Sequence, residues 1–280
     1  MNKFYQELEN YLQNKQLQEL NKQKKQSTKL YDKIIARLNR LYADAIDEDG
    51  NYRYDYYKTQ KIKEQAFKEI QTWLLNSYAV LFAFLLGVFV YAYNANAKYL
   101  MQQAPQDVWG TLDKEIPFLD GVAAKIKYEY EISGLYGQQA LTNSYSKLLT
   151  DVNNVIAKIN SLGISQNKAT KLVDEAFGRY ERRQKRIYRT EGHRVEELAK
   201  YISAQDVLNK GHNVVKVWHN MQDDRVRDTE RADHVHLEGQ QQALNEPYLL
   251  IPTGVTQCPG SSGIADQDIN CRCKSEYKII

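Results

Sequence analysis

Apolar residues recur at the spacing of an α-helix over the first three quarters of the chain. In residues 3–46 this pattern rests on Phe4, Leu8, Tyr11, Leu12, Leu30, Ile34, Ile35, Leu38 and Leu41, and it predicts one long helix. Further helices are predicted from about residue 58 and over residues 122–136, 141–162 and 167–209. Ser165 is expected to cap the last of these, and Gly211 to end it. Turn-forming residues predict loops over residues 47–51 and 104–121.

Residues 73–93 form a stretch without any charge, WLLNSYAVLFAFLLGVFVYAY. Its length and hydropathy qualify it as a membrane span, which needs ~20 apolar residues. Asn76, Ser77 and several aromatic residues dilute the apolar run, and a helix buried on all sides in a bundle has the same composition. The buried helix is the favoured interpretation, and the membrane segment stays open as the alternative.

After residue 212 the pattern changes to the two-residue period of strands. Strands are predicted at Val214–Trp218, at residues 248–251 before Pro252, and at residues 272–279. We therefore predict an α+β fold: an elongated, mainly α-helical N-terminal region, residues 1–178, followed by a small C-terminal α+β module, residues 179–280, with a short antiparallel sheet.

The charge of the chain is nearly balanced, at a net +3 over 280 residues, which argues against a strong field for nucleic acid. Basic residues nevertheless gather in two stretches. These are Lys22, Lys24, Lys25, Lys29, Lys33, Arg37 and Arg40, and then Arg179, Arg182, Arg183, Lys185, Arg186, Arg189 and Arg194. Two solvated helix faces explain them best, and the alternative is non-specific, salt-dependent contact with DNA phosphates.

All three cysteines lie in the last 23 residues, and an odd count argues for free thiols or a metal site rather than a disulfide framework. Cys271 and Cys273 would point to one side of an extended strand. With Cys258 and His234 they make a set of ligands that tetrahedral zinc accepts, and zinc is the only cofactor that we consider. The alternative is that the cysteines are small buried apolar residues of a reduced protein.

The same region holds many paired charges. Glu191 and Arg194 can meet across one helical turn near Arg189, and we expect this group to dock a helix onto the C-terminal module. The run of Asp224, Arg225, Arg227 and Asp228 is expected to lock a loop or a helix end, because arginine binds carboxylates in a bidentate manner. Trp218 is expected in the core, and Gly239 is expected to supply a backbone angle that other residues resist.

An enzyme remains the alternative class. His234, His236 and Asn270 could belong to a metal-dependent nuclease, but their spacing is loose and no pair of acidic ligands accompanies them. Ser-His-Asp chemistry, phosphate-binding glycine loops and dinucleotide fingerprints are absent from the sequence. We therefore expect no catalytic residues and no cofactor-binding residues.

The markers of the last hundred residues stand in a fixed order. They are Arg189-Thr190-Glu191 with Arg194, Lys216 with Trp218, Asp224-Arg225 with Arg227, His234 with Leu237 and Gly239, then Pro252, and finally Asn270-Cys271-Arg272-Cys273. This order closely resembles the phage Mu F-like head morphogenesis family, over about residues 180–279. There are two departures from that pattern: residues 230–233 are inserted before His234, so that His236 could take its place, and residues 267–269 include no histidine.

The resemblance implies a minor head (minor capsid) protein of a tailed phage or prophage. Such a protein would act in procapsid assembly and genome packaging, present in few copies beside the portal protein and the head or scaffold proteins. It would be made in the bacterial host cytoplasm, would reside in the virion head or at the portal vertex, and would leave with the DNA at ejection. In that setting the basic stretches suggest contact with DNA, and the helix at residues 73–93 suggests contact with a membrane.

Overall fold

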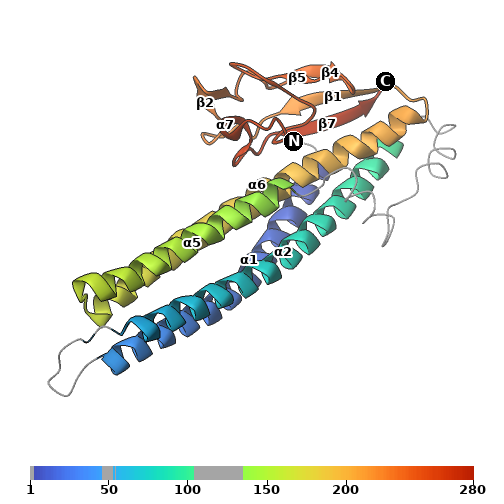
Figure 1. Ribbon diagram of the computed structural model, residues 1–280. Helices are drawn as coiled ribbons and strands as arrows, with labels where there is room; N and C mark the ends of the chain where they lie inside the picture. Colours follow the sequence, from blue (N-terminus) through green and yellow to red (C-terminus); the bar gives the residue numbers. More distant parts are fainter. Residues whose placement is uncertain (1–2, 46–52, 54, 104–134) are drawn as a thin grey trace. The chain divides into compact units, whose positions relative to one another are not determined.

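The computed structural model describes residues 3–45, 53, 55–103 and 135–280, and these form an α+β fold, as the sequence predicts (Figure 1). The helices are α1 (Lys3–Ala45), α2 (Tyr56–Met101), α5 (Leu135–Leu162), α6 (Gln166–Asn209) and the short α7 (Ala265–Asp268). The strands are β1 (Val214–His219), β2 (Asp228–Thr229), β3 (Ala232–Asp233), β4 (Gln241–Ala243), β5 (Tyr248–Leu249), β6 (Val255–Thr256) and β7 (Lys274–Ile279). The predicted loops at 47–51 and 104–121 and most of the predicted helix at 122–136 lie outside the described residues.

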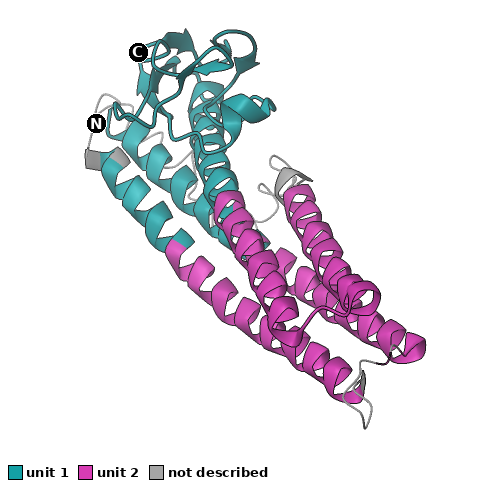
Figure 2. Ribbon diagram, turned by 90° about the vertical axis from the view of Figure 1, so that its left-hand side faces the viewer, with its two compact units in different colours: residues 1–16, 82–134, 188–280 teal, residues 17–81, 135–187 magenta. Residues whose placement is uncertain are grey.

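The chain divides into two compact units (Figure 2). Unit 1 comprises residues 1–16, 82–134 and 188–280, and unit 2 comprises residues 17–81 and 135–187. Helices α1, α2 and α6 each contribute residues to both units, so neither unit is one continuous piece of sequence. The division that the sequence suggests between residues 178 and 179 falls inside α6 and stays a prediction.

Unit 2 is a bundle of helices with an aromatic centre. The rings of Trp73, Tyr145 and Tyr180, from α2, α5 and α6, lie 4.9–5.3 Å apart between their centroids. Such tilted aromatic pairs contribute about 0.5–1.5 kcal/mol each beyond the burial of their area. The N-terminus of α6 begins as predicted, because Ser165 Oγ accepts a hydrogen bond from the Lys168 amide at 3.4 Å.

Unit 1 contains the three-stranded antiparallel sheet, in the order β4-β1-β7. The predicted strands at 214–218 and 272–279 are confirmed as β1 and β7, which pair from Val214↔Ile279 to His219↔Lys274. The predicted strand at 248–251 is shorter than expected, since β5 covers only Tyr248–Leu249 and pairs with β6 instead of joining the main sheet. Strands β2, β3, β4 and β6 have two or three residues each, which is too short for an alternating pattern to show.

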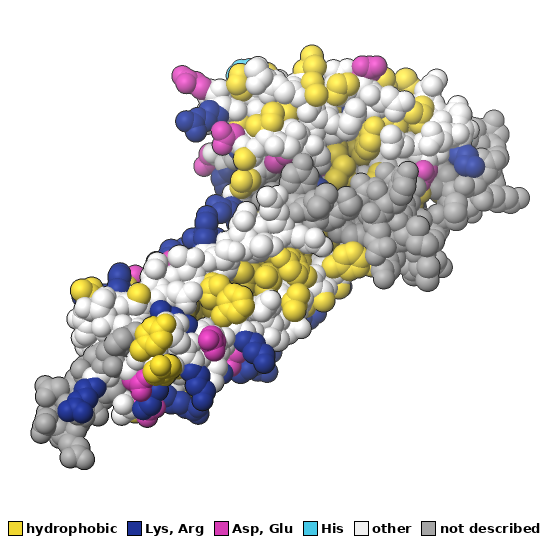
Figure 3. All heavy atoms as spheres, viewed as in Figure 1, with side chains coloured by type: hydrophobic (Ala, Val, Ile, Leu, Met, Phe, Trp, Pro, Cys, Tyr) yellow, Lys and Arg dark blue, Asp and Glu magenta, His cyan; other side chains and the backbone are white. Residues whose placement is uncertain are grey.

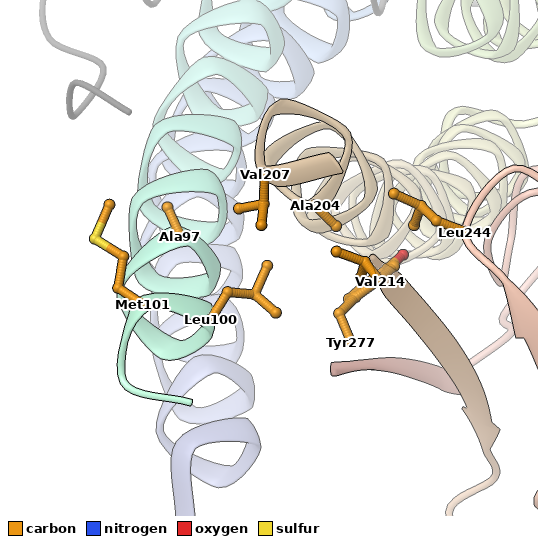
Figure 4. Packing of buried hydrophobic residues seen from close by; sticks show 8 residues of the cluster. All are labelled: Ala97, Leu100, Met101, Ala204, Val207, Val214, Leu244 and Tyr277. Atoms are coloured by element: carbon orange, nitrogen blue, oxygen red, sulfur yellow. The ribbon is translucent and has the colours of Figure 1, made fainter. Parts of the chain in front are cut away.

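Helices α2 and α6 pack against this sheet through one apolar cluster (Figure 4). Ala97, Leu100 and Met101 come from α2, Ala204 and Val207 from α6, Val214 and Tyr277 from the sheet, and Leu244 follows β4. Val214 and Tyr277 belong to the face of the sheet that α6 covers, because residues two apart on a strand share a face. Gly211 lies between the end of α6 and the start of β1. Its φ of 90° is the left-handed angle expected of a glycine that ends a helix.

Helix α2 contains the uncharged stretch at 73–93. It is the one helix among the described residues that is long and apolar enough to cross a membrane, with a mean hydropathy of 2.0 in its most apolar 18-residue window. Only 39% of that window is buried: Val88 and Phe89 are buried, whereas Leu75 is 63% exposed. The stretch is therefore a helix, and its partial burial leaves both interpretations of its role open.

Candidate functional site

One face of α6 is hydrogen-bonded to residues 270–275, the segment that leads into β7 and its first residues. The Thr190 hydroxyl accepts a hydrogen bond from the Asn270 amide at 3.2 Å, and the Glu197 carboxylate accepts one from the Ser275 amide at 2.9 Å. The Lys200 ammonium group donates to the Ser275 carbonyl oxygen at 3.3 Å. Positions separated by three or four residues share a helix face, so one stripe of α6 meets residues 270–275 in order. We call this contact the α6–β7 seam.

Buried charges are paired within the seam. Lys200 Nζ lies 2.6 Å from Glu197 Oε1 with both side chains fully buried, and Lys274 Nζ lies 3.3 Å from Glu196 Oε1. Burial by itself raises the pKa of Glu196, but the Lys274 and Lys200 ammonium groups outweigh it and leave that pKa lowered. Removing one member of such a pair leaves an uncompensated buried charge, which costs about 3–5 kcal/mol.

Three of the four ligands proposed from the sequence for zinc come together at the start of β7. Nδ1 of His234 lies 3.4 Å from Cys273 Sγ and 3.8 Å from Cys271 Sγ, and all three side chains are buried. A hydrogen bond with the Cys273 thiol, followed by those with His193 and His234, holds the pKa of Cys271 well below its usual value against the opposing effect of burial. These neighbours therefore favour the thiolate form of Cys271.

The orientation of the His234 ring is dictated by Gln267 in α7. The Gln267 amide nitrogen donates to the carbonyl oxygens of Ile251, at 2.9 Å, and Arg231, at 3.3 Å, so its other atom must be the acceptor oxygen. That oxygen lies 2.8 Å from Nε2 of His234, which must therefore carry a hydrogen. In the neutral ring Nδ1 is then unprotonated, and its lone pair faces the two cysteine sulfurs.

The fourth residue of the predicted set, Cys258, does not belong to this group. Its side chain is fully buried next to Lys216 and Glu197, and burial raises the pKa of its thiol to about 12. It therefore behaves as the small buried apolar residue that the sequence offered as the alternative. The side chain that does approach the cluster is His193 of α6, whose ring contacts the Cys271 thiol and which sequence reasoning missed.

The charged run after β1 is organised around Asp223 rather than around Asp224. Asp223 accepts two hydrogen bonds from the Arg272 guanidinium, at 2.9 and 2.5 Å, and three from Arg225, one from its backbone amide and two from its guanidinium, the shortest at 2.8 Å. These bonds, with that from Arg272 first, hold the pKa of Asp223 well below its usual value. Asp224 is exposed, and the carboxylate that holds the two arginines is that of its neighbour Asp223. Arg227 binds the carbonyl oxygens of Gln267 and Ile269 instead of a carboxylate.

The remaining motif residues have structural surroundings. Arg194 and Glu191 form the predicted contact at 2.5 Å with little exposure, while Arg189 is exposed. Trp218 is buried, with its ring edge-on to His234 and Tyr248. Two positions have the left-handed backbone angles that few residues adopt easily: Gly239, with a φ of 77°, as expected, and Asn270, with a φ of 57°.

Lys216, on β1, is a buried lysine with defined partners. Its Nζ donates to the carbonyl oxygen of Gln257 at 2.8 Å and to the side-chain oxygen of the same residue at 2.7 Å. The ammonium group also lies 5.2 Å from the ring centroid of Tyr201 and 4.8 Å from that of Tyr248. Burial lowers the pKa of Lys216 to about 8.

A pocket of about 260 Å³ opens over the cysteine cluster. It is lined by Met221, Arg225, Val226, Arg227, His234, Asn270, Cys271, Arg272 and Cys273. The trio considered for a nuclease does not converge there: His234 and Asn270 line the pocket, whereas His236 is exposed and bonded to Asp233 at 2.5 Å. Arg225 and Arg272 are already paired with Asp223, so the pocket wall is built from groups that bind one another.

Comparison with known proteins agrees with the resemblance drawn from the sequence. Residues 150–276 match the family described as Phage Mu protein F like protein. Over 91 residues the chain is 37% identical to the Minor head protein GP7 of Bacillus phage SPP1, a match that covers 32% of this chain and 28% of that protein. No solved structure matches the chain. Residues 150–276 are therefore the part of the chain that is similar to the phage Mu F-like family.

Proposed function

We propose that the chain is a minor head protein that acts in head morphogenesis of a tailed phage or prophage, at the portal vertex. The observation that carries this proposal is the match of residues 150–276 to the Mu F-like family. The matched range includes strands β1 to β6, the first half of β7 and the α6–β7 seam. The relative that matches over 91 residues is named a minor head protein. The partners would be the portal protein and the head or scaffold proteins, and the location would be the virion, after synthesis in the host cytoplasm.

The chemistry of the motif supports a structural role without catalysis. Thr190 and Asn270 bind each other, Asp223 holds Arg225 and Arg272, and Glu191 is paired with Arg194. Groups that are occupied in this way stabilise a fold and are not available to a substrate. The motif residues therefore bind one another within α6, within the strand region and, through Thr190 and Asn270, between the two.

The assembly role can be tested with tagged protein in cells that produce the phage heads. Procapsids made with and without the portal protein would be separated by sedimentation and probed for the tag. We expect the chain in portal-containing procapsids and its loss from those without portal. Equal amounts in both would contradict the portal location but leave a head role, and absence from both would contradict the head role itself.

Departure with the genome is part of the same proposal and has its own test. Purified virions would be triggered to eject DNA, and the emptied heads would be separated from the released material. We expect the chain to leave the heads together with the DNA. Quantitative retention in emptied heads would contradict ejection without affecting the role in assembly.

Contact with a membrane is a second candidate, favoured by the partial burial of the uncharged stretch of α2. Leu75 is 63% exposed within that stretch, and Leu17 on α1 is a matched exposed leucine outside it, at 59%. If α2 inserts, Leu75→Glu should reduce flotation of the full chain with liposomes, because a charge in the hydrocarbon region costs several kcal/mol. Leu17→Glu should leave flotation unchanged. Equal effects of the two variants, or no flotation of the wild type, would remove this candidate.

DNA contact would be weak and non-specific. The basic residues of α1, such as Lys24, Lys25 and Lys29, are exposed. On the face shown in Figure 3, however, basic side chains over the helices of unit 2 alternate with acidic and apolar ones. A mixed surface of this kind predicts binding that disappears as salt rises from low to physiological concentration, which a filter-binding titration would measure.

A further inference from the structure

We propose that His193, His234, Cys271 and Cys273 together bind one zinc ion, with His193 of α6 as the fourth ligand in place of Cys258. The bound ion would link α6 to the segment that leads into β7, within the α6–β7 seam. The proposal concerns the folding of unit 1 and stands independently of the role of the chain in the phage head.

The spacing of the three clustered ligands already matches tetrahedral zinc. Bond lengths of about 2.3 Å to sulfur and 2.0–2.1 Å to nitrogen place a bound sulfur and nitrogen about 3.6 Å apart in that geometry. The observed separations from His234 Nδ1 are 3.4 Å to Cys273 Sγ and 3.8 Å to Cys271 Sγ. A zinc ion would therefore need little movement of these three residues.

The second ring nitrogen of His234 is held as zinc-binding histidines require. Its Nε2–H donates to the Gln267 side-chain oxygen at 2.8 Å, and Gln267 is fixed in turn by its bonds to Ile251 and Arg231. Such an outer contact fixes the tautomer and aims the free lone pair at the metal. The geometry of Gln267 is thus explained by a ligand at Nδ1.

His193 supplies the missing ligand from the helix. Its side chain is buried, its ring contacts the Cys271 thiol, and its Nε2 has no hydrogen-bond partner among the described residues. A buried imidazole nitrogen without a partner is destabilising, and a metal bond would remove that cost. The ligand atom of His193 does not lie within 4.8 Å of all three of the others, so we expect its ring to turn toward them when the ion binds.

The backbone beside His193 leaves room for the ring. Gly260 has a φ of 76°, and a β-carbon at that position would stand 3.3 Å from Cδ2 of His193 and 3.8 Å from its Nε2. On the other side, Glu196 and Glu197 place carboxylate oxygens within 4.8 Å of a His193 ring nitrogen. A carboxylate near the second nitrogen of a metal-binding histidine orients the ring and raises its basicity.

Charge favours two cysteines over three. When Cys271 and Cys273 lose their protons, two thiolates neutralise Zn²⁺, and two neutral imidazoles complete a site of zero net charge. A third thiolate from Cys258 would leave a buried negative charge near Glu196 and Glu197, which is costly in a protein interior. Thiolate and imidazole together select zinc over magnesium or calcium. Four protein ligands leave no position for a substrate, as in structural zinc sites.

X-ray absorption at the zinc edge on the full wild-type chain tests the ligand set directly. We expect one zinc per chain with two sulfur and two nitrogen neighbours. Three sulfurs and one nitrogen would restore Cys258 and overturn the proposal. Two sulfurs with one imidazole and water would overturn it as well, in favour of an open site. A chain that binds no zinc, or one in which Cys271 and Cys273 are oxidised to a disulfide, would also refute it.

Variants separate His193 from its neighbours. With Co²⁺ in place of zinc, His193→Asn should weaken binding at least tenfold and change the visible bands of tetrahedral cobalt. His236→Ala, at an exposed histidine, and Cys258→Ala, at a buried cysteine outside the cluster, should leave affinity and spectrum unchanged. Unaltered cobalt binding by His193→Asn would contradict the proposal. If that variant does not fold, the absorption measurement on the wild type decides alone.

Discussion

Thr190 on α6 accepts a hydrogen bond from the backbone amide of Asn270 at 3.2 Å, although the two residues are 80 positions apart in the chain. Both residues belong to the ordered motif, one at its beginning and one at its end. Asn270 has a φ of 57°, so this contact holds a turn whose backbone angle few residues adopt easily. Motif residues that are remote in sequence are thus neighbours at one end of the α6–β7 seam.

Replacing Thr190 by valine should weaken unit 1. The change keeps the shape of the side chain and removes the acceptor, so we expect a loss of about 0.5–1.5 kcal/mol in the free energy of unfolding. Thr28→Val is a matched control, because the Thr28 hydroxyl bonds only within its own helix, to Lys24. Urea titration followed by circular dichroism measures both variants. Equal stability of Thr190→Val and the wild type would show that this bond contributes nothing.

The buried pair Glu197–Lys200 predicts a non-additive response. Glu197→Gln leaves the Lys200 ammonium group without its carboxylate and should cost about 3–5 kcal/mol. The double variant Glu197→Gln with Lys200→Met should be less destabilised than that single variant, since it removes the stranded charge. Lys22→Gln, which breaks a pair with Glu19 in which the lysine side chain is 65% exposed, should change stability by less than about 1 kcal/mol. Additive losses in the double variant would contradict a coupled buried pair.

Asp223 predicts a loss of stability in acid. Its folded pKa is depressed by Arg272 and Arg225, so its contribution is present above the unfolded pKa of about 3.9 and is lost as the pH falls through the folded value. Between pH 5 and pH 2, Asp223→Asn should therefore lose less stability than the wild type. Asp224→Asn, at the adjacent exposed position, should follow the wild-type curve. Thermal melts across this range would reveal the difference, and parallel curves for all three proteins would rule out the Asp223 contribution.

His219 and Glu276, both in unit 1, make the stability of that unit depend on pH in two separate ranges. Glu276 has a pKa lowered to about 2, mainly by its hydrogen bond with His219, and the pKa of His219 is raised by Glu276 and Glu238. The Glu276 contribution is present above its unfolded value of about 4.3 and is lost as the pH falls toward 2. The His219 contribution is present below about 6.5 and is lost as the pH rises through its folded pKa.

We therefore expect His219→Asn to remove part of the fall in stability of the wild type as the pH rises above 6.5. NMR titration of the His219 ring should give a pKa above that of a model histidine. His212→Asn serves as a second histidine variant in the same unit. A His219 pKa at or below the model value would contradict the assigned contacts with the two glutamates.

Gly239 and Gly260 have nearly the same backbone angle but different surroundings. Comparing alanine variants at the two positions therefore separates backbone strain from steric crowding. Gly239 and Gly260 have φ values of 77° and 76°, so alanine at either position costs about 1–2 kcal/mol in strain. A β-carbon at Gly239 meets nothing within 4 Å, whereas one at Gly260 meets the His193 ring at 3.3 Å. Gly260→Ala should therefore be the more destabilising of the two in urea titrations. The reverse order would contradict close packing of Gly260 against His193.

The helices and the two long strands follow from the sequence because their apolar residues repeat over many positions. Strand β1 could be predicted from Val214, Val215, Val217 and Trp218, and β7 from its alternation up to Ile279. The shorter strands carry no such signal, since their pairing depends on loop geometry. The α+β class follows from the change of period near residue 212.

The candidate site was predictable only in part. Cys271, Cys273 and His234 stand out by residue type, but the path of the loop that carries Cys258 cannot be read from spacing. His193 was missed because it lies in a helix whose polar residues look like a solvated face. The sequence does contain a signal for it. Polar residues recur every three or four positions at Thr190, His193, Glu197 and Lys200, and such residues lie on one face of a helix. Asp223 and Asp224 are adjacent and chemically identical, so only the structure distinguishes them.

The α6–β7 seam has a consequence for synthesis on the ribosome. Residues 188–209 of α6 emerge well before residues 270–279, and during that interval Glu197 has no Ser275 amide to accept from and Lys200 has no Ser275 carbonyl oxygen to donate to. The nascent helix therefore presents a stripe of charge that water must solvate until β7 arrives and pairs with β1. Unit 1 can therefore complete its fold only after residues 270–279 are made. A polypeptide that lacks them cannot form the α6–β7 seam.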